Sequence, residues 1–366
     1  MRILTIVGAR PQFIKAAMVS REIQARNRDG ETSRIDEVII HTGQHYDSNM
    51  SDVFFKELGI PEPAANLQAG TGTHGEMTGL MLVGLEREML HREPDLVLVY
   101  GDTNSTLAGA LAAAKLHIPV AHVEAGLRSF NKRMPEEVNR ILTDHLAAQL
   151  FCPTQTSIAN LAREGITEQV HRVGDVMYDA ALLFGKLAVS TSGILDRLGL
   201  VRKPFALATV HRSENTDDPA RLSEILAGLQ ALDLTVVLPV HPRTKSRLPP
   251  GLLAGGSSNL LLTDPLSYLD MVMLEKHASV ILTDSGGVQK EAYFHGVPCI
   301  TLRDETEWVE TIEAGWNQLA GADRHRIPAC MARTGKGQPI PDYGDGHSAS
   351  LIVSLVSAPA AMESGR

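Results

Sequence analysis

Short apolar runs alternate with longer segments of helical periodicity from the first residues of the chain. Residues 3–7 form an apolar run, and residues 13–25 show the spacing of an amphipathic helix. Alternation of this kind is typical of βαβ units, because parallel strands are joined by crossover helices. It predicts an α/β fold with helices on both faces of parallel sheets. The same alternation of a strand with a helix recurs at 37–41 and 50–58, 96–100 and 105–116, 120–123 and 136–147, and 205–210 and 220–232. Two further strands are predicted at 236–240 and 260–262.

The alternation loosens in the middle of the chain. A helical piece at residues 180–187 and the polar run Ser190-Thr-Ser-Gly193 predict a crossing between two domains. A chain of 366 residues is also longer than a single hydrophobic core usually supports. We expect two doubly wound, Rossmann-like domains with a cleft between them, over residues 1–173 and 174–346, and a terminal helix within 347–361 that packs back on the first.

Composition excludes several classes of protein. The net charge of −9 and the pI near 5.9 argue against nucleic acid as a partner. No apolar run approaches the ~18 residues of a membrane span, and the first strand begins too early for a signal peptide. The cysteines Cys152, Cys299 and Cys330 lack CxxC spacing. We therefore expect a protein of a reducing compartment, with neither structural zinc nor a membrane partner.

One stretch in the second half has the pattern of a nucleotide site. Residues 280–282 predict a buried strand, Asp284-Ser-Gly-Gly287 a tight turn, and Val288 the start of a helix. Glycines let a ligand approach the backbone, and a helix N-terminus attracts phosphate. Glu291, one turn into the helix, is placed to bind ribose hydroxyls. The stretch predicts a site for a nucleotide diphosphate, with an ordinary capped helix as the alternative.

Cationic residues follow the first strand. Gly8-Ala-Arg-Pro-Gln-Phe-Ile-Lys15 places Arg10 and Lys15 near a helix N-terminus, where two cations would hold a diphosphate. A solvated surface turn is the alternative. The second strand ends in His41-Thr-Gly-Gln-His45, which is a weaker polar signal. Both segments matter because ligands of open α/β sheets bind beyond the carboxyl ends of the strands.

Acids mark the next strand ends. Asp102 follows the strand at 96–100, Glu124 follows the strand at 120–123, and Glu136 opens a helix, where its charge favours the dipole. For Asp102 the alternative is a capping role at the helix that begins near Ser105. Carboxylates that converge repel one another and raise at least one pKa, which suits proton transfer. The three acids therefore predict acid–base chemistry.

Two histidines follow strands in the second half. His211 comes after the strand at 205–210 and His241 after the strand at 236–240, so we expect both on the ligand side. A lone histidine is more often structural, but two at strand ends beside a diphosphate turn favour a functional role. No HxH or HExxH spacing indicates a metal site, so we expect no metal.

Taken in order, eight segments resemble the non-hydrolysing UDP-N-acetylglucosamine 2-epimerases: GARPQFIKAA, TGQH, GDTNST, HVEAGLRS, MPEEVNR, TVHRSEN, LPVHP and TDSGGVQKEA. The resemblance implies a GT-B-like fold and a cytoplasmic homodimer that acts on a UDP-sugar for a cell-surface polysaccharide. It also implies reversible conversion of UDP-GlcNAc to UDP-ManNAc, with no cofactor or metal, by elimination of UDP to a 2-acetamidoglucal and re-addition.

The resemblance also assigns roles. Asp102, Glu124 and Glu136 match the family's acid positions and would supply base and acid at C2, without a fixed division of labour. His211 matches the active-site histidine and would stabilise the departing pyrophosphate with Arg10 and Lys15. The UDP contacts would then be Ser285, Gly286 and Gly287 at the phosphates, Glu291 at the ribose, and Leu266 and Met271 near the uracil.

Three departures from the family pattern concern the residues near the uracil and those near the sugar. Leu266 and Met271 stand where the family has Gln and Phe, and Trp308-Val309 stands where it has Arg-Pro. A further segment brings Lys132 and Arg133 close to the predicted acids. These changes resemble the branch that acts on UDP-2,3-diacetamido-2,3-dideoxyglucuronic acid. We hypothesise that Lys132 or Arg133 pairs with the C6 carboxylate of such a sugar; solvated cations are the alternative.

A regulatory site of some bacterial members has a poor match here. That site binds UDP-GlcNAc as an activator through a Gln-His-x-Gln run and a later arginine. The corresponding run is Gln44-His-Tyr-Asp47, and residues 66–70 contain no arginine. The sequence therefore predicts weak or absent activation of that type.

Three other functions would share parts of the pattern. A GT-B glycosyltransferase has the fold and the nucleotide turn, but the order of acids at Asp102, Glu124 and Glu136 argues against it. A hydrolysing epimerase often carries a fused kinase domain, for which 366 residues are too few. A non-enzymatic sugar-nucleotide sensor has no use for three acids. The sequence therefore favours an isomerase.

Overall fold

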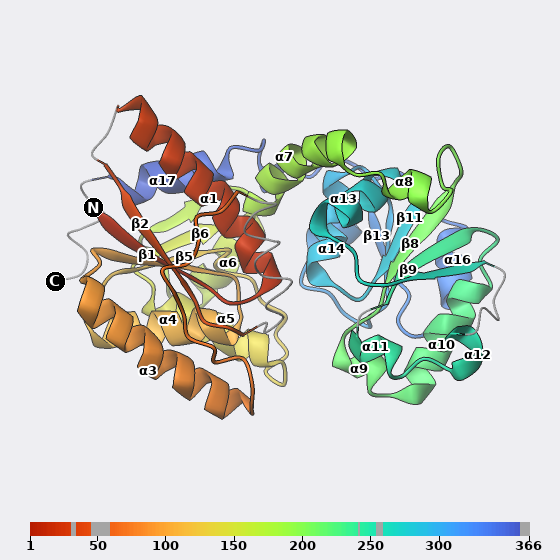
Figure 1. The fold of residues 1–366 in the computed structure, drawn as a ribbon, viewed down its shortest axis with the longest axis horizontal. Coiled ribbons are helices and arrows are strands. Elements are labelled where there is room, and N and C mark those ends of the chain that lie inside the picture. Colours follow the sequence, from red (N-terminus) through yellow and green to blue (C-terminus); the bar gives the residue numbers. More distant parts are fainter. Residues whose placement is uncertain (31–33, 45–58, 241, 254–258, 359–366) are drawn as a thin grey trace. The chain divides into compact units, whose positions relative to one another are not determined.

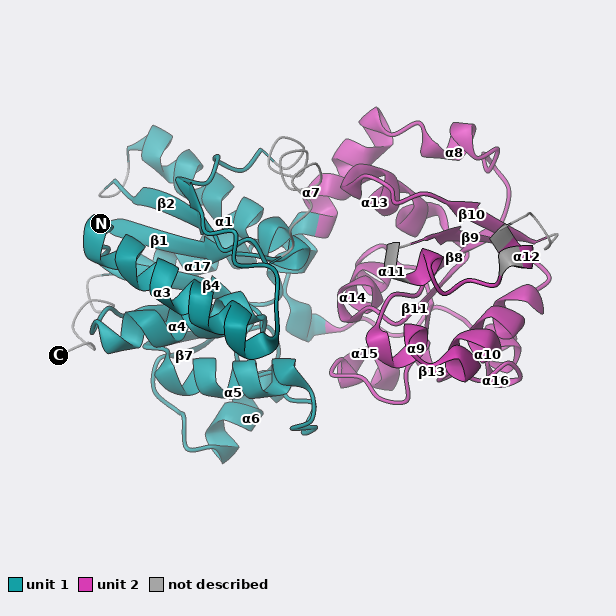
Figure 2. Ribbon diagram, turned by 60° about the horizontal axis from the view of Figure 1, so that its bottom comes forward, with its two compact units in different colours: residues 1–180, 341–366 teal, residues 181–340 magenta. Residues whose placement is uncertain are grey.

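Two parallel β-sheets, one in each of two units, organise this computed structural model (Figure 1). The structure describes residues 1–30, 34–44, 59–240, 242–253 and 259–358. Unit 1 comprises residues 1–180 and 341–366, and unit 2 comprises residues 181–340 (Figure 2). Strands alternate with helices in both units, so the predicted α/β class is confirmed. The predicted helix at 50–58 and His241 lie outside the described residues.

The sheet of unit 1 has seven parallel strands in the order β3-β2-β1-β4-β5-β6-β7. From β1 the chain proceeds outward to β2 and β3, then returns to the other side of β1 at β4. This reversal is a topological switch point, where the loops after β1 and β4 diverge and leave room for a ligand. The strands are β1 (Arg2–Val7), β2 (Asp36–His41), β3 (Ala65–Asn66), β4 (Leu96–Tyr100), β5 (Val120–Val123), β6 (Gln149–Cys152) and β7 (Val170–Arg172).

Helices cover both faces of this sheet, as Figure 1 shows for α1 on one side and α3 and α4 on the other. Alternate strand side chains face opposite layers, so Leu4, Ile6, Val97 and Val99 share one core cluster with Met81 of α3. All five residues of β4 are buried, which accounts for its unbroken apolar run. The helices are α1 (Arg10–Asp29), α3 (His74–Arg92), α4 (Asn104–Lys115), α5 (Pro135–Leu146) and α6 (Gln155–Arg163).

Unit 2 repeats the same plan with six parallel strands in the order β10-β9-β8-β11-β12-β13. Its switch point lies between β8 and β11. The strands are β8 (Phe205–Thr209), β9 (Thr235–Pro239), β10 (Leu260–Thr263), β11 (Val280–Thr283), β12 (Cys299–Thr301) and β13 (Asn317–Leu319). The helices are α8 (Ile194–Arg197), α9 (Ser213–Thr216), α10 (Pro219–Gln230), α11 (Pro242–Lys245), α12 (Pro250–Leu253), α13 (Tyr268–His277), α14 (Gly286–Phe294), α15 (Val309–Glu313) and α16 (Arg326–Met331).

A single helix, α7 (Val176–Thr191), carries the chain from unit 1 into unit 2, and Figure 2 shows the change of unit within it. The sequence pattern predicted only a helical piece at 180–187 followed by polar residues. The helix is longer because its sequence, VMYDAALLFGKLAVST, contains no proline and only one glycine to interrupt it.

The last helix, α17 (Ser348–Val356), follows the short turn η1 (Pro341–Tyr343) and belongs to unit 1. The carboxylate of Asp179 accepts the backbone N–H groups of Ser348 (3.1 Å) and Ala349 (2.8 Å), at the helix end where a negative charge is favourable. Arg26 of α1 donates to the carbonyl of Ser350 (2.7 Å). These bonds fix the C-terminal segment against the first helix, and Figure 1 shows α17 beside α1.

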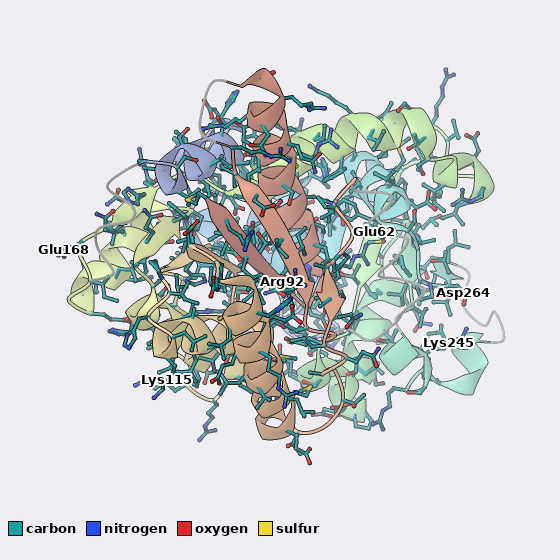
Figure 3. All side chains as sticks on the ribbon, turned by 60° about the vertical axis from the view of Figure 1, so that its left-hand side comes forward. Glu62, Arg92, Lys115, Glu168, Lys245 and Asp264 are labelled. Carbon is teal, nitrogen blue, oxygen red and sulfur yellow. The ribbon has the colours of Figure 1, made fainter. Side chains whose placement is uncertain are left out.

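Many charged side chains lie on the outside of both units, among them those labelled in Figure 3. Lys245 and Asp264 form an exposed ion pair at 3.0 Å, and Arg92 pairs with Glu88 of the same helix at 2.7 Å. The three cysteines are buried free thiols. Within the described part of the chain, no helix has both the length and the apolar character that crossing a bilayer requires.

Candidate active site

The loops after β1 and β4 are joined at the switch point of unit 1 by one buried glutamine. Gln12 Oε1 accepts the backbone N–H groups of Gly8 (2.8 Å) and Ala9 (3.0 Å). Its Nε2 donates to the carbonyl of Tyr100 (2.8 Å) and to the hydroxyl of Thr106 (3.0 Å). The amide group thereby makes four hydrogen bonds. It fixes the start of α1 relative to the loop that carries Asp102.

Glu124 follows β5 and forms an ion pair with Lys15 of α1. Both side chains are nearly buried, with 11% and 8% exposed. The φ of Glu124 is +75°, a left-handed conformation that costs energy for a residue with a side chain. The backbone N–H groups of Glu124 (3.0 Å) and Ala125 (3.1 Å) both donate to the carbonyl of Phe151, which holds this conformation. Lys15, predicted at a diphosphate, therefore lies against one of the predicted acids.

Asp102 follows β4 and forms an ion pair with Arg140 of α5. Only 4% of the Arg140 side chain is exposed, whereas 31% of the Asp102 side chain is exposed. Asn139 Nδ2 donates to the backbone carbonyl of Asp102 (3.0 Å), so α5 holds both the backbone and the side chain of this residue. The N-cap residue of α4 is Thr103, so Asp102 does not take the alternative capping role.

The two acids are brought together by Gly101, which lies between β4 and Asp102. Its φ is +64°, and a Cβ at this position would lie 3.2 Å from Glu124 Oε2 and 3.4 Å from Lys15 Nζ. The residue before Asp102 therefore packs directly on the Glu124–Lys15 pair. Adjacent strands β4 and β5 thus place both carboxylates at one edge of the sheet.

The two glutamates at the start of α5 have different environments. Glu137 is buried, and its carboxylate accepts the backbone N–H of Phe130 (2.8 Å) and an N–H of Arg140 (3.0 Å). Glu136 is half-buried and precedes Arg140 by four residues, which places both on one face of the helix. Glu137 therefore supports the loop before α5 and contacts Arg140, while Glu136 is partly exposed in the first turn of the helix.

A buried network lies behind the two acids. His122 Nδ1 is 2.7 Å from Asp144 Oδ1, and its Nε2 is 2.7 Å from the carbonyl oxygen of Gly101. Asp144 Oδ2 accepts from Gly126 N (3.1 Å) and Arg128 Nη1 (2.7 Å). Burial opposes the charge of Asp144, but the bonds from His122 and Arg128 outweigh it and hold its pKa below the ordinary value. The network connects the loops after β4 and β5.

In unit 2, His211 follows β8 and lies against Asp284, which follows β11. The His211 Nδ1–Asp284 Oδ1 distance is 3.0 Å; the imidazole is 41% exposed and the carboxylate is fully buried. Asp284 also accepts the backbone N–H of Arg212 (3.0 Å) and Asn215 Nδ2 (3.2 Å). Despite burial, the bonds from His211, Arg212 and Asn215 hold the pKa of Asp284 below its ordinary value. The aspartate fixes the ring with Nδ1 inward and Nε2 on the opposite edge.

The predicted diphosphate turn forms the amino end of α14. Ser285 is its N-cap residue, and the hydroxyl accepts the N–H of Val288 (3.4 Å). The helix therefore begins at Gly286, two residues before the predicted start, because the serine caps it there. A Cβ at Gly286 would clash with the carboxylate of Glu307. At Gly287 the nearest atom of the described residues to an added Cβ would be Ser285 Oγ, at 3.8 Å, so these residues leave space beside it.

The other predicted site residues lie in both units. Arg10 begins α1 in unit 1 and is partly buried. Glu291 lies in α14 of unit 2 and is buried, with 7% of its surface exposed. Leu266 and Met271 are partly buried and pack against a core cluster of unit 2 that includes Phe205 and Ile281. The exposed residues Lys132 and Arg133 precede α5.

Sequence reasoning missed three supporting side chains. Arg140 lies four residues after Glu136, a helical spacing that signals a shared face. Asp284 was treated only as part of the turn, although it holds His211. Asp144 has no sequence signal, because its partners lie on another strand and loop. Among the described residues, no group of three or more His, Cys, Asp or Glu side chains is arranged to hold a metal ion.

A model of the UDP-N-acetylglucosamine 2-epimerase family matches residues 28–357. The chain belongs to this family. It is 51% identical to the UDP-2,3-diacetamido-2,3-dideoxy-D-glucuronate 2-epimerase of Pseudomonas aeruginosa, over 98% of this chain and 99% of the relative. The family resemblance predicted from the sequence is therefore confirmed.

Solved structures agree with this membership. The UDP-GlcNAc 2-epimerase of Methanocaldococcus jannaschii, in complex with UDP-GlcNAc and UDP, superposes with a TM-score of 0.89 at 43% identity, over 98% of this chain and 99% of that chain. A glycosyltransferase from Streptomyces nogalater has a TM-score of 0.55 at 15% identity, over 98% and 99% of the two chains, and shares the fold alone. The predicted GT-B-like fold of this epimerase family member is confirmed.

Proposed function

We propose that this family member reversibly inverts C2 of a UDP-linked 2-acetamido sugar without hydrolysing it. The observation that supports the proposal most is the pair of carboxylates at neighbouring strand ends. Asp102 is held by Arg140 and Glu124 by Lys15, each through a buried cation. Two fixed carboxylates on one sheet edge are suited to remove a proton from one face of a carbon and deliver one to the other face.

The proposed reaction proceeds through a glycal. The C2 hydrogen is not acidic, so its removal is coupled to cleavage of the C1–O bond. One carboxylate takes the C2 proton, a C1–C2 double bond forms, and UDP leaves with the electron pair of the broken bond. UDP then adds back to C1 while a proton is delivered to the opposite face of C2. The sequence of steps is redox-neutral and consumes no water, so it requires no cofactor.

Residues of unit 1 then have separate tasks. We assign base and acid at C2 to the group Asp102, Glu124 and Glu136, without dividing the two tasks among them. Lys15 compensates the charge of Glu124. The sequence predicted that Lys15 binds a diphosphate; we now propose that Lys15 holds this acid in place. Arg10, at the first turn of α1, remains a proposed contact of the pyrophosphate.

Residues of unit 2 bind UDP in this proposal. His211, oriented by Asp284, stabilises the charge that develops on the departing pyrophosphate. Ser285, Gly286 and Gly287 offer the amino end of α14 to phosphate oxygens. Glu291 binds the ribose, and Leu266 and Met271 lie near the uracil.

Proton NMR in D2O tests the reaction. Purified protein is incubated with UDP-GlcNAc, and the C2 and anomeric signals are followed. We expect UDP-ManNAc to appear with deuterium at C2, and deuterium to enter C2 of the remaining substrate, because the intermediate has lost the C2 proton. Release of free sugar and UDP would instead indicate hydrolysis. Absence of exchange with UDP-GlcNAc and with its 2,3-diacetamido uronate analogue would overturn the proposal.

A second candidate substrate is UDP-2,3-diacetamido-2,3-dideoxyglucuronate. The P. aeruginosa relative with this activity in its name is 51% identical, and the M. jannaschii enzyme is 43% identical. Lys132 and Arg133 are exposed immediately before α5, near Glu136. Their side chains are available for a C6 carboxylate, which the neutral sugar lacks.

Alanine substitutions at Lys132 and Arg133 test this second candidate. We expect the ratio of kcat/KM for the uronate to that for UDP-GlcNAc to fall about tenfold, the effect of losing roughly 1.4 kcal/mol of charge pairing. Lys115→Ala, at an exposed lysine of the same unit labelled in Figure 3, is the matched control. An unchanged ratio would show that the two cations do not select the sugar.

We also propose that the protein is a cytoplasmic homodimer. On α3 the side chains of Leu80, Val83 and Leu90 are 59%, 50% and 61% exposed, and their spacing of three and seven residues places them on one stripe. An apolar stripe of this kind is typical of helix pairing between subunits. Light scattering coupled to gel filtration tests the assembly: we expect a dimer for the native chain and a monomer for Leu80→Glu combined with Leu90→Glu.

A further inference from the structure

Trp308 has a buried indole N–H without a partner. The residue is only 4% exposed, and Nε1 makes no hydrogen bond with any of the described residues. A buried donor that has given up water without gaining an acceptor costs free energy, so such groups are rare in folded proteins. The unsatisfied N–H therefore points to an acceptor that arrives with a ligand.

The indole nitrogen lies at the amino end of α14. It is 3.3 Å from the position that a Cβ on Gly286, the first residue of this nine-residue helix, would occupy. The first backbone N–H groups of a helix have no acceptor within the helix itself, and together with the helix dipole they attract anions. The indole nitrogen of Trp308 thus lies close to the first residue of the helix.

The surroundings of the indole strengthen it as a donor to an anion. Lys290 Nζ lies 3.8 Å from the centroid of the Trp308 ring, and Lys290 is 1% exposed. A cation on the face of an aromatic ring withdraws electron density and makes the indole N–H a better donor. The carboxylate of Glu307, beside the same glycine, is compensated by Arg303 at 2.9 Å. An anionic oxygen is therefore a suitable acceptor here.

We infer that Trp308 binds the diphosphate of the UDP-sugar through its indole Nε1–H. The inference rests on the proposed function for the identity of the ligand, and it deepens that proposal by adding a binding residue in α15's amino-terminal loop. The neutral indole supplies the hydrogen bond, and Lys290 beneath the ring supplies positive charge without contacting the oxygen directly. Trp308 acts at the diphosphate and not at the uridine.

Calorimetric titration of Trp308→Phe with UDP and with uridine tests this assignment. Phenylalanine keeps an aromatic face for Lys290 and removes only the N–H donor. We expect UDP to bind about tenfold more weakly, because a hydrogen bond to a charged oxygen is lost, and uridine to bind unchanged. Trp316→Phe is the matched control, since Trp316 Nε1 already donates to the carbonyl of Gln338 (2.7 Å). The control should bind UDP like the native chain.

Unchanged UDP affinity in Trp308→Phe would overturn the assignment, as would an equal loss of UDP and uridine affinity. If the native chain binds UDP but exchanges no C2 hydrogen, the proposed function is wrong, and the assignment of Trp308 to the diphosphate is still tested by the UDP titrations. A second measurement leaves Trp308 intact. The chain has two tryptophans, so Trp316→Phe reports Trp308 alone. We expect saturating UDP, but not uridine, to shift or quench its fluorescence; emission that does not respond to UDP would also overturn the assignment.

Discussion

Each unit places a histidine against a buried aspartate beside its switch point, but the two pairs differ in exposure. His122 and Asp144 of unit 1 are 2.7 Å apart and both side chains are 0% exposed. His211 and Asp284 of unit 2 are 3.0 Å apart, and the His211 side chain is 41% exposed. In both pairs the pKa of the aspartate lies below its ordinary value, through the bonds from its own histidine and from further donors.

The difference lies in what the second ring nitrogen does. His122 directs Nε2 to the carbonyl of Gly101, so its hydrogen-bonding capacity serves the loop that carries Asp102. His211 lies at the end of β8 with an accessible ring edge, beside the amino end of α14. A histidine–aspartate pair supports the backbone in unit 1, and we propose that the exposed pair in unit 2 meets a ligand. Exposure at the strand end, not the pairing itself, distinguishes the two roles.

The largest effect is expected at the acid of unit 1. Glu124→Gln keeps the shape of the side chain and removes its charge, so we expect kcat for C2 exchange to fall about 10³-fold. The affinity for UDP should stay near the native value, because the proposed UDP contacts are mainly on unit 2. NMR exchange rates and calorimetry measure the two quantities. Glu168→Gln, an exposed residue of unit 1 (Figure 3), should change neither.

The buried histidine should matter for stability. His122→Phe removes the two ring nitrogens that lie 2.7 Å from Asp144 Oδ1 and 2.7 Å from the Gly101 carbonyl oxygen, both in a fully buried place. We expect the free energy of unfolding to fall by about 3 kcal/mol, as for the loss of one partner of a buried charged pair. Urea unfolding followed by circular dichroism measures the change. A variant as stable as the native chain would show that the network does not support the loops.

The exposed histidine should show the opposite behaviour. His211→Phe removes a group that faces solvent and the proposed pyrophosphate, so we expect kcat to fall about 10²-fold. The free energy of unfolding should fall by less than in His122→Phe, because Asp284 keeps the backbone N–H groups of residues 211 and 212 and the amide of Asn215. The two phenylalanine variants are controls for each other. If both lost stability alike, the distinction between the pairs would be wrong.

Acid should weaken both pairs. The folded pKa values of Asp144 and Asp284 lie below the ordinary value of 3.8. The stability that these carboxylates contribute is therefore complete above that value and is lost as the pH falls through the lower, folded pKa values. Urea midpoints measured from pH 5 downward should decline, and Asp144→Asn should decline less steeply from a lower starting point. Equal slopes would contradict the assignment.

The smallest effect concerns the two glycines of the diphosphate turn. Gly287→Ala meets only Ser285 Oγ at 3.8 Å, so we expect native stability and about tenfold weaker UDP binding, since the new methyl group occupies space beside the phosphate site. Gly286→Ala should lower stability, because its methyl group clashes with Glu307. Thermal unfolding and calorimetry separate the two outcomes. Native UDP affinity in Gly287→Ala would place the phosphate elsewhere.

The sequence predicted the elements of the fold better than it predicted the contacts of the site. Strands such as β4 and β11 are unbroken apolar runs, because buried parallel strands face helices on both sides. The start of α14 was placed two residues late, since the pattern of apolar residues begins at Val288 while the hydrogen bonds begin after Ser285. The periodicity of apolar residues indicates which side chains are buried, but it does not indicate which residue caps the helix.

The partners of the predicted acids depend on tertiary structure. Lys15 and Glu124 are 109 residues apart in sequence, and Asp102 and Arg140 are 38 apart, so no local spacing connects them. The sequence could place each residue at the correct strand end or helix start. It could not show that the lysine forms an ion pair with the glutamate, because that depends on where the fold places α1 relative to the end of β5.

The docking of α17 on α1 has a consequence for the order in which the protein is made. The strands of unit 2 lie in one continuous segment, residues 181–340. Unit 1 begins the chain, yet Arg26 and Asp179 form part of their hydrogen bonds with residues 348–354. The half of the protein that is synthesised first therefore lacks one of its helices until residues 348–356 have been made.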